Sequence, residues 1–226
     1  MKGYKMTKVG GVFLTNGSTN PALEVGKRFD CSNTVLNHRV HGPGYHFCRY
    51  IWDTMMYGNP RDYEIWEIVS DEDAIGSVNR LCYVTKSFKV IRKLTRDEVV
   101  RRISNLDDDI ILGEPAQLKK KALLYKFWST TLSGDPDPEI REIVAGLGEY
   151  PYVLSYDKDP KVRAAVARTG GCLDRLMNDP DWRVRYEICK LGYGLEVLSE
   201  DPHPEVQALA KKLLVKSESD VSEMIG

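Results

Sequence analysis

The sequence predicts an α+β protein. A small mixed domain with mostly antiparallel strands, residues 1–108, precedes an all-α stack of helical repeats, residues 109–216. Two observations predict this division: a pattern with a 22-residue period runs through residues 135–214, and short strand-like segments separated by Gly, Pro and Asn fill the first half. A fixed period of this size marks a repeat architecture, in which each unit buries its apolar side against its neighbours.

Equivalent residues of the repeated half fall into columns spaced by 22 positions. The clearest columns hold Asp135, Asp157, Asp179 and Asp201; Pro138, Pro160 and Pro204; Arg141, Arg163 and Arg185; Gly148, Gly170 and Gly192; and Leu154, Leu176 and Leu198. Asp at 137, 159 and 181 suits a helix N-cap, Pro suits the first helical position, and Gly suits the left-handed residue after a helix. These signals predict helices over 138–147, 160–169 and 182–191. Each is followed by a second short helix, and a preceding cap repeat covers 113–134.

The repeat consensus carries a family resemblance. Asp159-Pro160-Lys161-Val162-Arg163, with the matching run at 179–185, resembles the leucine-rich repeat variant, a relative of HEAT repeats. The resemblance covers roughly residues 110–214 and implies alternating α and short 3₁₀-like helices. Some relatives hold an iron–sulfur cluster on an N-terminal Cys group. This chain lacks such a group, so we predict no cofactor. The resemblance is almost silent on function.

The first half predicts short elements joined by turns. In chain order they are a hairpin or bent strand in 1–15, a strand at 45–48, a short helix at 49–57, strands at 63–69 and 81–94 with a break near Lys86, and a helix from Thr95 to Ile103. Thr95 and Glu98 form a capping-box pattern at the start of that helix. Residues 107–109, three Asp, predict a joint, and residues 217–226 predict a flexible tail.

The first half also resembles a family. Gly44-Tyr45-His46-Phe47-Cys48 and the run 88–95 resemble an uncharacterised domain of bacteriophages and bacteria, whose hallmark is a Gly-Phe/Tyr-His-Phe-Cys strand. The match spans about residues 1–103. Members often have a Cys-Arg-Gly-Phe-like stretch before the position of Glu24, where this chain has 16–22. The resemblance implies a phage-type protein that modulates a host system such as an antiviral defence.

Composition excludes several classes of function. The 226 residues have a formal net charge of −1. Residues 1–112 hold 16 Lys and Arg against 14 Asp and Glu, and the rest hold 16 against 19, so neither half has the basic excess of a general nucleic-acid binder. The five Cys include no CxxC pair, which favours a reduced, cytoplasmic protein. No apolar run reaches the length of a membrane span or a signal core, so we predict no membrane association.

Two constellations in the first half could carry chemistry. His38, His41, His46 and Cys48 are residue types that bind zinc, but His46 and Cys48 are as easily a packed pair on one strand face, and we predict no metal. His46 followed by Glu64 and Glu67 resembles the NAD-binding pattern of ADP-ribosyltransferase-type folds, where a Glu polarises the cofactor. The alternative is a solvated strand edge. A nucleotide-dependent enzyme is therefore a rival reading, and we predict no catalytic residue.

The Arg column could form a basic ladder for phosphate, as in a HEAT-like DNA-binding face. Each Arg also follows a capping Asp by four residues, a spacing that favours an ion pair within one helix. The Asp columns cancel the charge of the Arg column, so we favour the structural role and regard nucleic-acid binding as unlikely.

The third repeat carries the strongest binding signal. A helical wheel places Val184, Ile188 and Leu191 on one face and Trp182, Tyr186 and Lys190 opposite, where the other repeats have smaller or charged residues; Tyr193 extends the set. Trp and Tyr beside a cation are favoured interface anchors. The alternative is that a neighbouring helix or the first domain covers them. The sequence thus predicts a non-catalytic adaptor or inhibitor that binds a host or phage protein; it does not indicate the oligomeric state.

Overall fold

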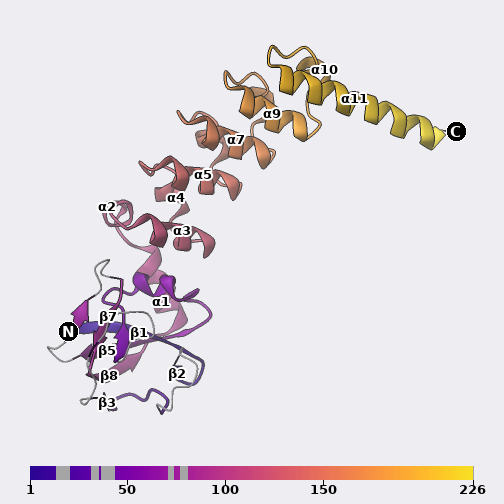
Figure 1. Ribbon diagram of the computed structural model, residues 1–226. Coiled ribbons are helices and arrows are strands. Elements are labelled where there is room, and N and C mark those ends of the chain that lie inside the picture. Colours follow the sequence, from indigo (N-terminus) through magenta and orange to yellow (C-terminus); the bar gives the residue numbers. More distant parts are fainter. Residues whose placement is uncertain (14–20, 32–35, 37–43, 71–73, 77–80, 226) are drawn as a thin grey trace. The chain divides into compact units, whose positions relative to one another are not determined.

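The computed structural model describes residues 1–13, 21–31, 36, 44–70, 74–76 and 81–225. The chain divides into two compact units, Met1–Ile110 and Ile111–Gly226. The first unit contains all the described strands and the second contains only helices (Figure 1). The fold class is α+β, as the sequence predicts.

Two antiparallel sheets form the first unit. Five strands pair in the order β2-β1-β5-β8-β3, with bounds Val12–Phe13, Lys2–Lys8, Glu64–Ser70, Ser87–Lys93 and Arg28–Asp30. Three more pair in the order β4-β7-β6, with bounds Tyr45–Phe47, Tyr83–Thr85 and Ile75–Gly76. A single bridge between Tyr4 and Cys48 joins β1 to the end of β4. The two sheets therefore continue into each other at β1.

Turn chemistry fixes the first hairpin. Gly10 and Gly11 have φ of +81° and +72°, and together with Val9 they connect β1 to β2. Two consecutive residues with positive φ produce the twist that matches paired antiparallel strands, and only Gly adopts this backbone without strain. A Cβ on Gly11 would also lie 2.7 Å from the backbone nitrogen of Leu23. The Gly-Gly signal in the sequence therefore sets the register of this edge.

Aromatic rings fill the core of the first unit. Phe29 and Phe88 stack with centroids 5.0 Å apart, and the Tyr45 ring meets Phe88 edge-on at 5.1 Å. Phe88 is completely buried. Rings of this size dominate the hydrophobic stabilisation of a small domain. Ring contacts of β4 with β3 and β8 consequently hold the two sheets together.

The remaining elements of the first unit follow the sequence signals closely. A 3₁₀-helix, η1, spans Trp52–Met56, and α1 spans Arg96–Ser104. Thr95 caps α1 by accepting the Glu98 amide at 3.2 Å. The Glu98 carboxylate instead bonds to Arg92 and Arg102, so only half of the expected capping box forms. The break near Lys86 separates β7 from β8, as predicted.

Ten helices follow α1 in the described chain. Four of these helices are four residues long: α4 (Ser129–Leu132), α6 (Pro151–Leu154), α8 (Leu173–Leu176) and α10 (Leu195–Leu198). Four others are nine residues long: α3 (Ala116–Leu124), α5 (Pro138–Gly146), α7 (Pro160–Arg168) and α9 (Trp182–Lys190). The others are α2, Asp108–Leu112, and α11, Pro204–Ile225. The helices α5, α7 and α9 begin 22 residues apart, and neighbours in this series pack on each other (Figure 1).

Caps and stops explain these lengths. Asp159 accepts the Lys161 amide at 2.8 Å, Pro160 occupies the first turn, and Gly170 follows the helix with φ +79°. The four-residue helices each follow a left-handed residue; Tyr150 and Cys172 do so with φ 52°. Each four-residue helix ends in a Leu, such as Leu176, and this geometry places that Leu in the buried interior.

One expectation for the helices differs from the structure. Leu191 was predicted on the buried face of α9, but it is half-exposed because the helix ends at Lys190 and the wheel no longer applies beyond it. Cys189 is buried there instead. The predicted flexible tail, residues 217–226, overlaps the end of α11, which continues to Ile225.

A ladder of ion pairs connects successive helical units. Arg163 donates to both carboxylate oxygens of Asp179, at 2.7 and 2.8 Å, and to the carbonyl oxygen of Asp157 at 2.8 Å. Arg141 and Arg185 repeat this pattern with Asp157 and Asp201. The Arg column is thus structural, as favoured, but its partner is the Asp sixteen residues later and not the capping Asp. The wrong partner was predicted because an i,i+4 rule sees only one helix.

Candidate protein-binding face

The nine-residue helices expose one surface, which we call the long-helix face. It comprises Lys120 on α3, Glu139 and Glu142 on α5, Lys161 and Arg168 on α7, and Trp182, Tyr186 and Lys190 on α9. Equivalent positions of the four helices, spaced by 22 residues, hold Lys120, Glu142, Ala164 and Tyr186. Because the helices are equivalent and packed in series, these side chains belong to one continuous surface of the second unit.

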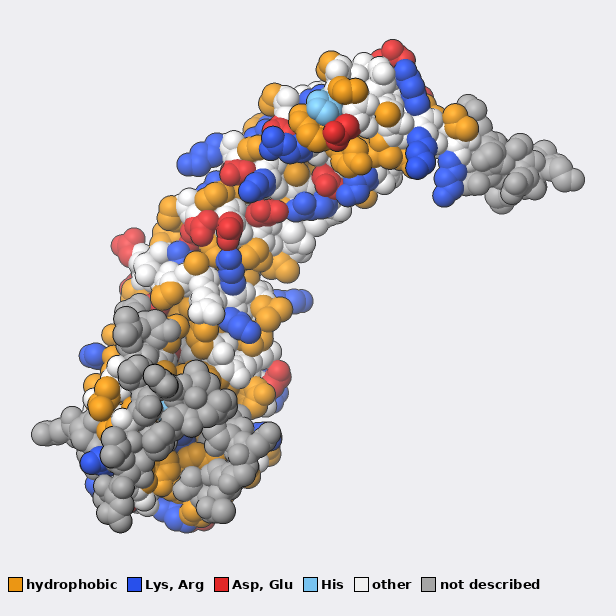
Figure 2. Space-filling model, viewed as in Figure 1, with side chains coloured by type: hydrophobic (Ala, Val, Ile, Leu, Met, Phe, Trp, Pro, Cys, Tyr) orange, Lys and Arg blue, Asp and Glu red, His pale blue; other side chains and the backbone are white. Residues whose placement is uncertain are grey.

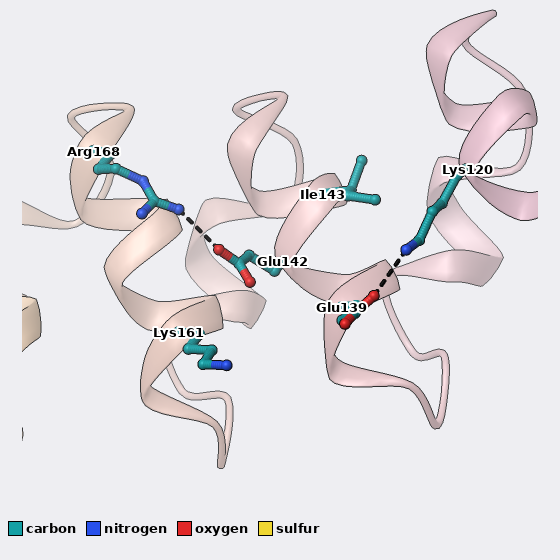
Figure 3. Close-up of a pocket in the computed structure, with 6 residues that line it drawn as sticks. All are labelled: Lys120, Glu139, Glu142, Ile143, Lys161 and Arg168. Atoms are coloured by element: carbon teal, nitrogen blue, oxygen red, sulfur yellow. Dashed lines mark hydrogen bonds and ion pairs between the residues drawn. The ribbon is translucent and has the colours of Figure 1, made fainter. Parts of the chain in front are cut away.

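A hollow of about 440 Å³ lies on the part of this face formed by α3, α5 and α7. Lys120 bonds to Glu139 at 2.8 Å, and Arg168 bonds to Glu142 at 3.0 Å (Figure 3). Each pair joins two neighbouring helices, and Lys161 also lines the space. Three cations therefore surround two carboxylates. Exposed pairs of this kind contribute little to stability, so their side chains can change partners at low cost.

The aromatic part of the face lies on α9. The rings of Trp182 and Tyr186 meet edge-on with centroids 6.2 Å apart, and the His203 ring stacks on the Trp182 ring with centroids 3.9 Å apart. Trp182 and Tyr186 are half-buried, while Lys190 is exposed and pairs with Glu187 at 3.0 Å. The chain itself thus covers part of the Trp182 ring, and solvent reaches the rest.

Tyr193 belongs to a different surface. Its hydroxyl donates to Asp174, and both residues line a second hollow of about 490 Å³. Tyr152 and Tyr156 line the same hollow and are 73% and 60% exposed. Arg175 lies over the Tyr156 ring, 3.6 Å from its centroid. We call Tyr152, Tyr156, Asp174, Arg175 and Tyr193 the tyrosine surface.

Sequence reasoning missed the tyrosine surface. Three Tyr within residues 150–156 were the available signal. The prediction compared helices of 22-residue spacing and left out the short segments between them. Tyr193 was joined to Trp182 and Tyr186 only because it follows them closely in the chain; the residues around it come from α6 and α8.

Glu64 and Glu67 serve the sheet of the first unit. The Glu67 side chain is almost fully buried and lies 2.7 Å from Arg92, 3.1 Å from Arg102 and 3.3 Å from Lys2. Burial alone would raise the pKa of Glu67, but these cations outweigh it and lower that pKa. The expectation of a solvated strand edge is wrong, because β5 lies in the middle of its sheet.

Glu64 is similarly engaged. It accepts the Gly11 amide at 2.9 Å and pairs with Lys93. Burial would raise the pKa of Glu64, and the bonds from Lys93 and Gly11 more than offset it, so the carboxylate stays ionised. Both carboxylates are thus committed to structural partners. The geometry gives no support to a Glu that polarises a nucleotide.

His46 and Cys48 lie near a buried lysine. Lys5 donates to the backbone oxygen of His46 at 2.7 Å, and its ammonium lies 4.7 Å from the centroid of Phe13. Burial lowers the pKa of Lys5 to about 8. Burial also raises the pKa of the Cys48 thiol. No pattern in the sequence predicts that Lys5 is buried, and His38 and His41 lie outside the described residues.

The described residues include no group of three or more His, Cys, Asp or Glu placed to hold a metal ion. None of the described helices is both long and apolar enough to cross a membrane. Comparison of the chain with protein-family models, with curated proteins and with solved structures gives no match. The surfaces described above are therefore the features of the chain that bear on its function.

Proposed function

We propose that this chain is a non-catalytic protein-binding module, and that it binds its partner through the long-helix face, with the α9 end as the anchor. The observation that carries the proposal is the Trp182–Tyr186 pair. At the positions of these two rings α7 has Pro160 and Ala164, so the aromatic pair distinguishes α9 from its neighbour. Partly exposed Trp and Tyr next to cations are the residues that most often dominate binding energy.

The charges of the face favour a protein over a nucleic acid as the partner. Figure 2 shows Lys and Arg interspersed with Asp and Glu on the visible side of the helical unit. Glu139 and Glu142 lie among the cations of the hollow, where a phosphate backbone would meet like charge. The ladder guanidiniums are turned to Asp side chains and backbone oxygens, so they are not offered to phosphate. A protein partner that presents charges of both signs, and an apolar group to the Trp182–Tyr186 pair, fits this surface better than a nucleic acid does.

The resemblance of the first unit to a phage-type domain adds a biological hypothesis. We infer from it that the partner belongs to a host system, such as an antiviral defence, and that binding modulates that system. A cytoplasmic location is part of this hypothesis. The long-helix face is proposed as a binding surface whichever system the partner belongs to.

Site-specific photocrosslinking tests the proposal. Tyr186→p-benzoylphenylalanine places the probe on the long-helix face, and the same substitution at Tyr152 places it on the tyrosine surface of the same unit. We expect the Tyr186 probe to crosslink one protein in the native cell and the Tyr152 probe to leave that protein unlinked. Crosslinking of this protein only from Tyr152 would refute the choice of face, and crosslinking of neither probe to protein would refute the module itself.

A further inference from the structure

Cys48 directly follows β4 and Cys82 directly precedes β7, so the two residues lie at the same end of this antiparallel strand pair. The antiparallel register of β4 and β7 pairs Tyr45 with Thr85, His46 with Val84 and Phe47 with Tyr83. One further step in this register places Cys48 opposite Cys82. Neither residue is part of a disulfide in this structure. They are 34 positions apart in the sequence, so the sequence spacing alone does not reveal the pair.

The hydrogen bonds of Cys48 define what kind of pair this is. The Cys48 amide donates to the Tyr4 oxygen at 2.8 Å, and the Tyr4 amide donates to the Cys48 oxygen at 2.7 Å. Both polar backbone groups of Cys48 therefore point toward β1, away from β7. Opposite residues of this type form a non-hydrogen-bonded pair, whose Cα atoms are about 4.5 Å apart and whose side chains share one face. That separation falls inside the range of about 4.4–6.8 Å found for disulfides.

The electrostatic surroundings agree with this register, because the two thiols lie within electrostatic reach of each other. Burial is the main cause of the raised pKa of Cys48, and Asp53 and Cys82 raise that pKa further. The pKa of Lys5 responds to both thiols, so its ammonium lies within electrostatic reach of each. Cys82 is half-buried, whereas Cys48 is almost fully buried, so an oxidant in solution meets Cys82 first.

From this geometry we propose that Cys48 and Cys82 form an oxidation site, at which a peroxide converts the two thiols into a cross-strand disulfide between β4 and β7. Peroxide first oxidises the Cys82 sulfur to a sulfenic acid and releases water. The Cys48 sulfur then attacks it, the S–S bond forms, and the hydroxyl leaves as a second water with the remaining thiol proton. Each thiol loses one hydrogen and the peroxide O–O bond is reduced. The site is independent of the long-helix face.

The test treats the folded, full-length chain with hydrogen peroxide and measures the intact mass and the tryptic peptides. We expect the loss of two hydrogens and one crosslinked peptide pair that joins Cys48 to Cys82, which dithiothreitol separates again. Cys82→Ser should abolish this product. This variant is preferred to one at Cys48 because its side chain is half-buried, so circular dichroism should show a folded protein.

Cys31→Ser is the matched control. Cys31 is also half-buried in the first unit, and its thiol lies 3.1 Å from the Lys86 carbonyl oxygen, so it is a competing thiol of similar exposure. The Cys31 variant should form the disulfide at the wild-type rate. A disulfide through Cys31, a crosslink that appears only after unfolding in urea, or oxidation of Cys82 to sulfinic acid without a crosslink would each overturn the proposal.

Discussion

Arg163→Ala should strongly destabilise the helical unit. The guanidinium of Arg163 makes a two-bond ion pair with Asp179 and also donates to the carbonyl oxygen of Asp157. The side chains of Arg163 and Asp179 are 11% and 2% exposed. The substitution therefore leaves a buried carboxylate that keeps its hydrogen bond from the Asp181 amide, at 2.9 Å, but loses its cation. The substitution also removes the ion pair between α7 and the residue, Asp179, that precedes α9.

The expected loss follows from burial. Removing one partner of a buried ion pair costs about 3–5 kcal/mol, because the other charge stays uncompensated. An exposed Arg–carboxylate pair contributes about 0.2–1 kcal/mol. Because the Asp179 side chain is almost completely buried, we expect the loss that is typical of a buried ion pair. Replacing both members together, Arg163→Met with Asp179→Leu, removes the isolated charge and should recover a large part of the loss.

Urea unfolding followed by far-UV circular dichroism measures these losses. The control is Arg183→Ala, since Arg183 is a surface residue whose side chain is 61% exposed and should change stability by less than about 0.5 kcal/mol. A loss below about 1 kcal/mol for Arg163→Ala would refute the reasoning. An Arg163→Met/Asp179→Leu protein less stable than Arg163→Ala would refute the explanation by uncompensated charge.

Four further outcomes follow from single features. Asp159→Ala removes an N-cap and should cost about 1 kcal/mol in the same urea assay; a change within error would contradict the capping role. Gly170→Ala should cost about 1–2 kcal/mol from φ +79° alone, because a Cβ there meets open space; a stabilised variant would show that the backbone is not left-handed. Glu67→Gln should lower the stability of the first unit by about 1.5–3 kcal/mol in urea unfolding followed by Trp fluorescence, and an unchanged urea midpoint would count against the cation cluster. The pKa of Asp201 is lowered chiefly by Arg185, so its stabilisation is present above the unfolded value of 3.8 and is lost as pH falls through the lower folded value; a melting temperature that stays level from pH 5 to about 2 would contradict this.

The sequence predicted the helical elements well because their signals are local. Asp159, Pro160 and Gly170 each act on the backbone within one turn, so their spacing gives the start and end of α7. Only one part of the ion-pair ladder was predicted, the structural role of the Arg residues. Arg163 was expected to have a structural role, but its partner, Asp179, lies on the next unit, and a contact of that kind depends on how the helices stack.

The sites were harder to predict, since they depend on contacts between distant segments. Trp182 was singled out because its column is otherwise small, but its stacking on His203 depends on the position of α11. Lys5 gave no signal at all, because an alternating strand pattern does not distinguish a buried lysine from an exposed one. Glu67 was placed on an exposed strand edge because strand order cannot be read from a single strand.

The affinity of the crosslinked partner for purified variants tests the central claim most directly. Isothermal titration would compare the wild type with Trp182→Ala/Tyr186→Ala and with Tyr152→Ala/Tyr156→Ala, which removes as many aromatic rings from the tyrosine surface. We predict that the first variant loses at least about 2 kcal/mol, roughly a thirtyfold weaker Kd, with its helical content retained. The second should bind as the wild type does. Equal affinity of the wild type and the Trp182→Ala/Tyr186→Ala variant would contradict the assignment of the long-helix face.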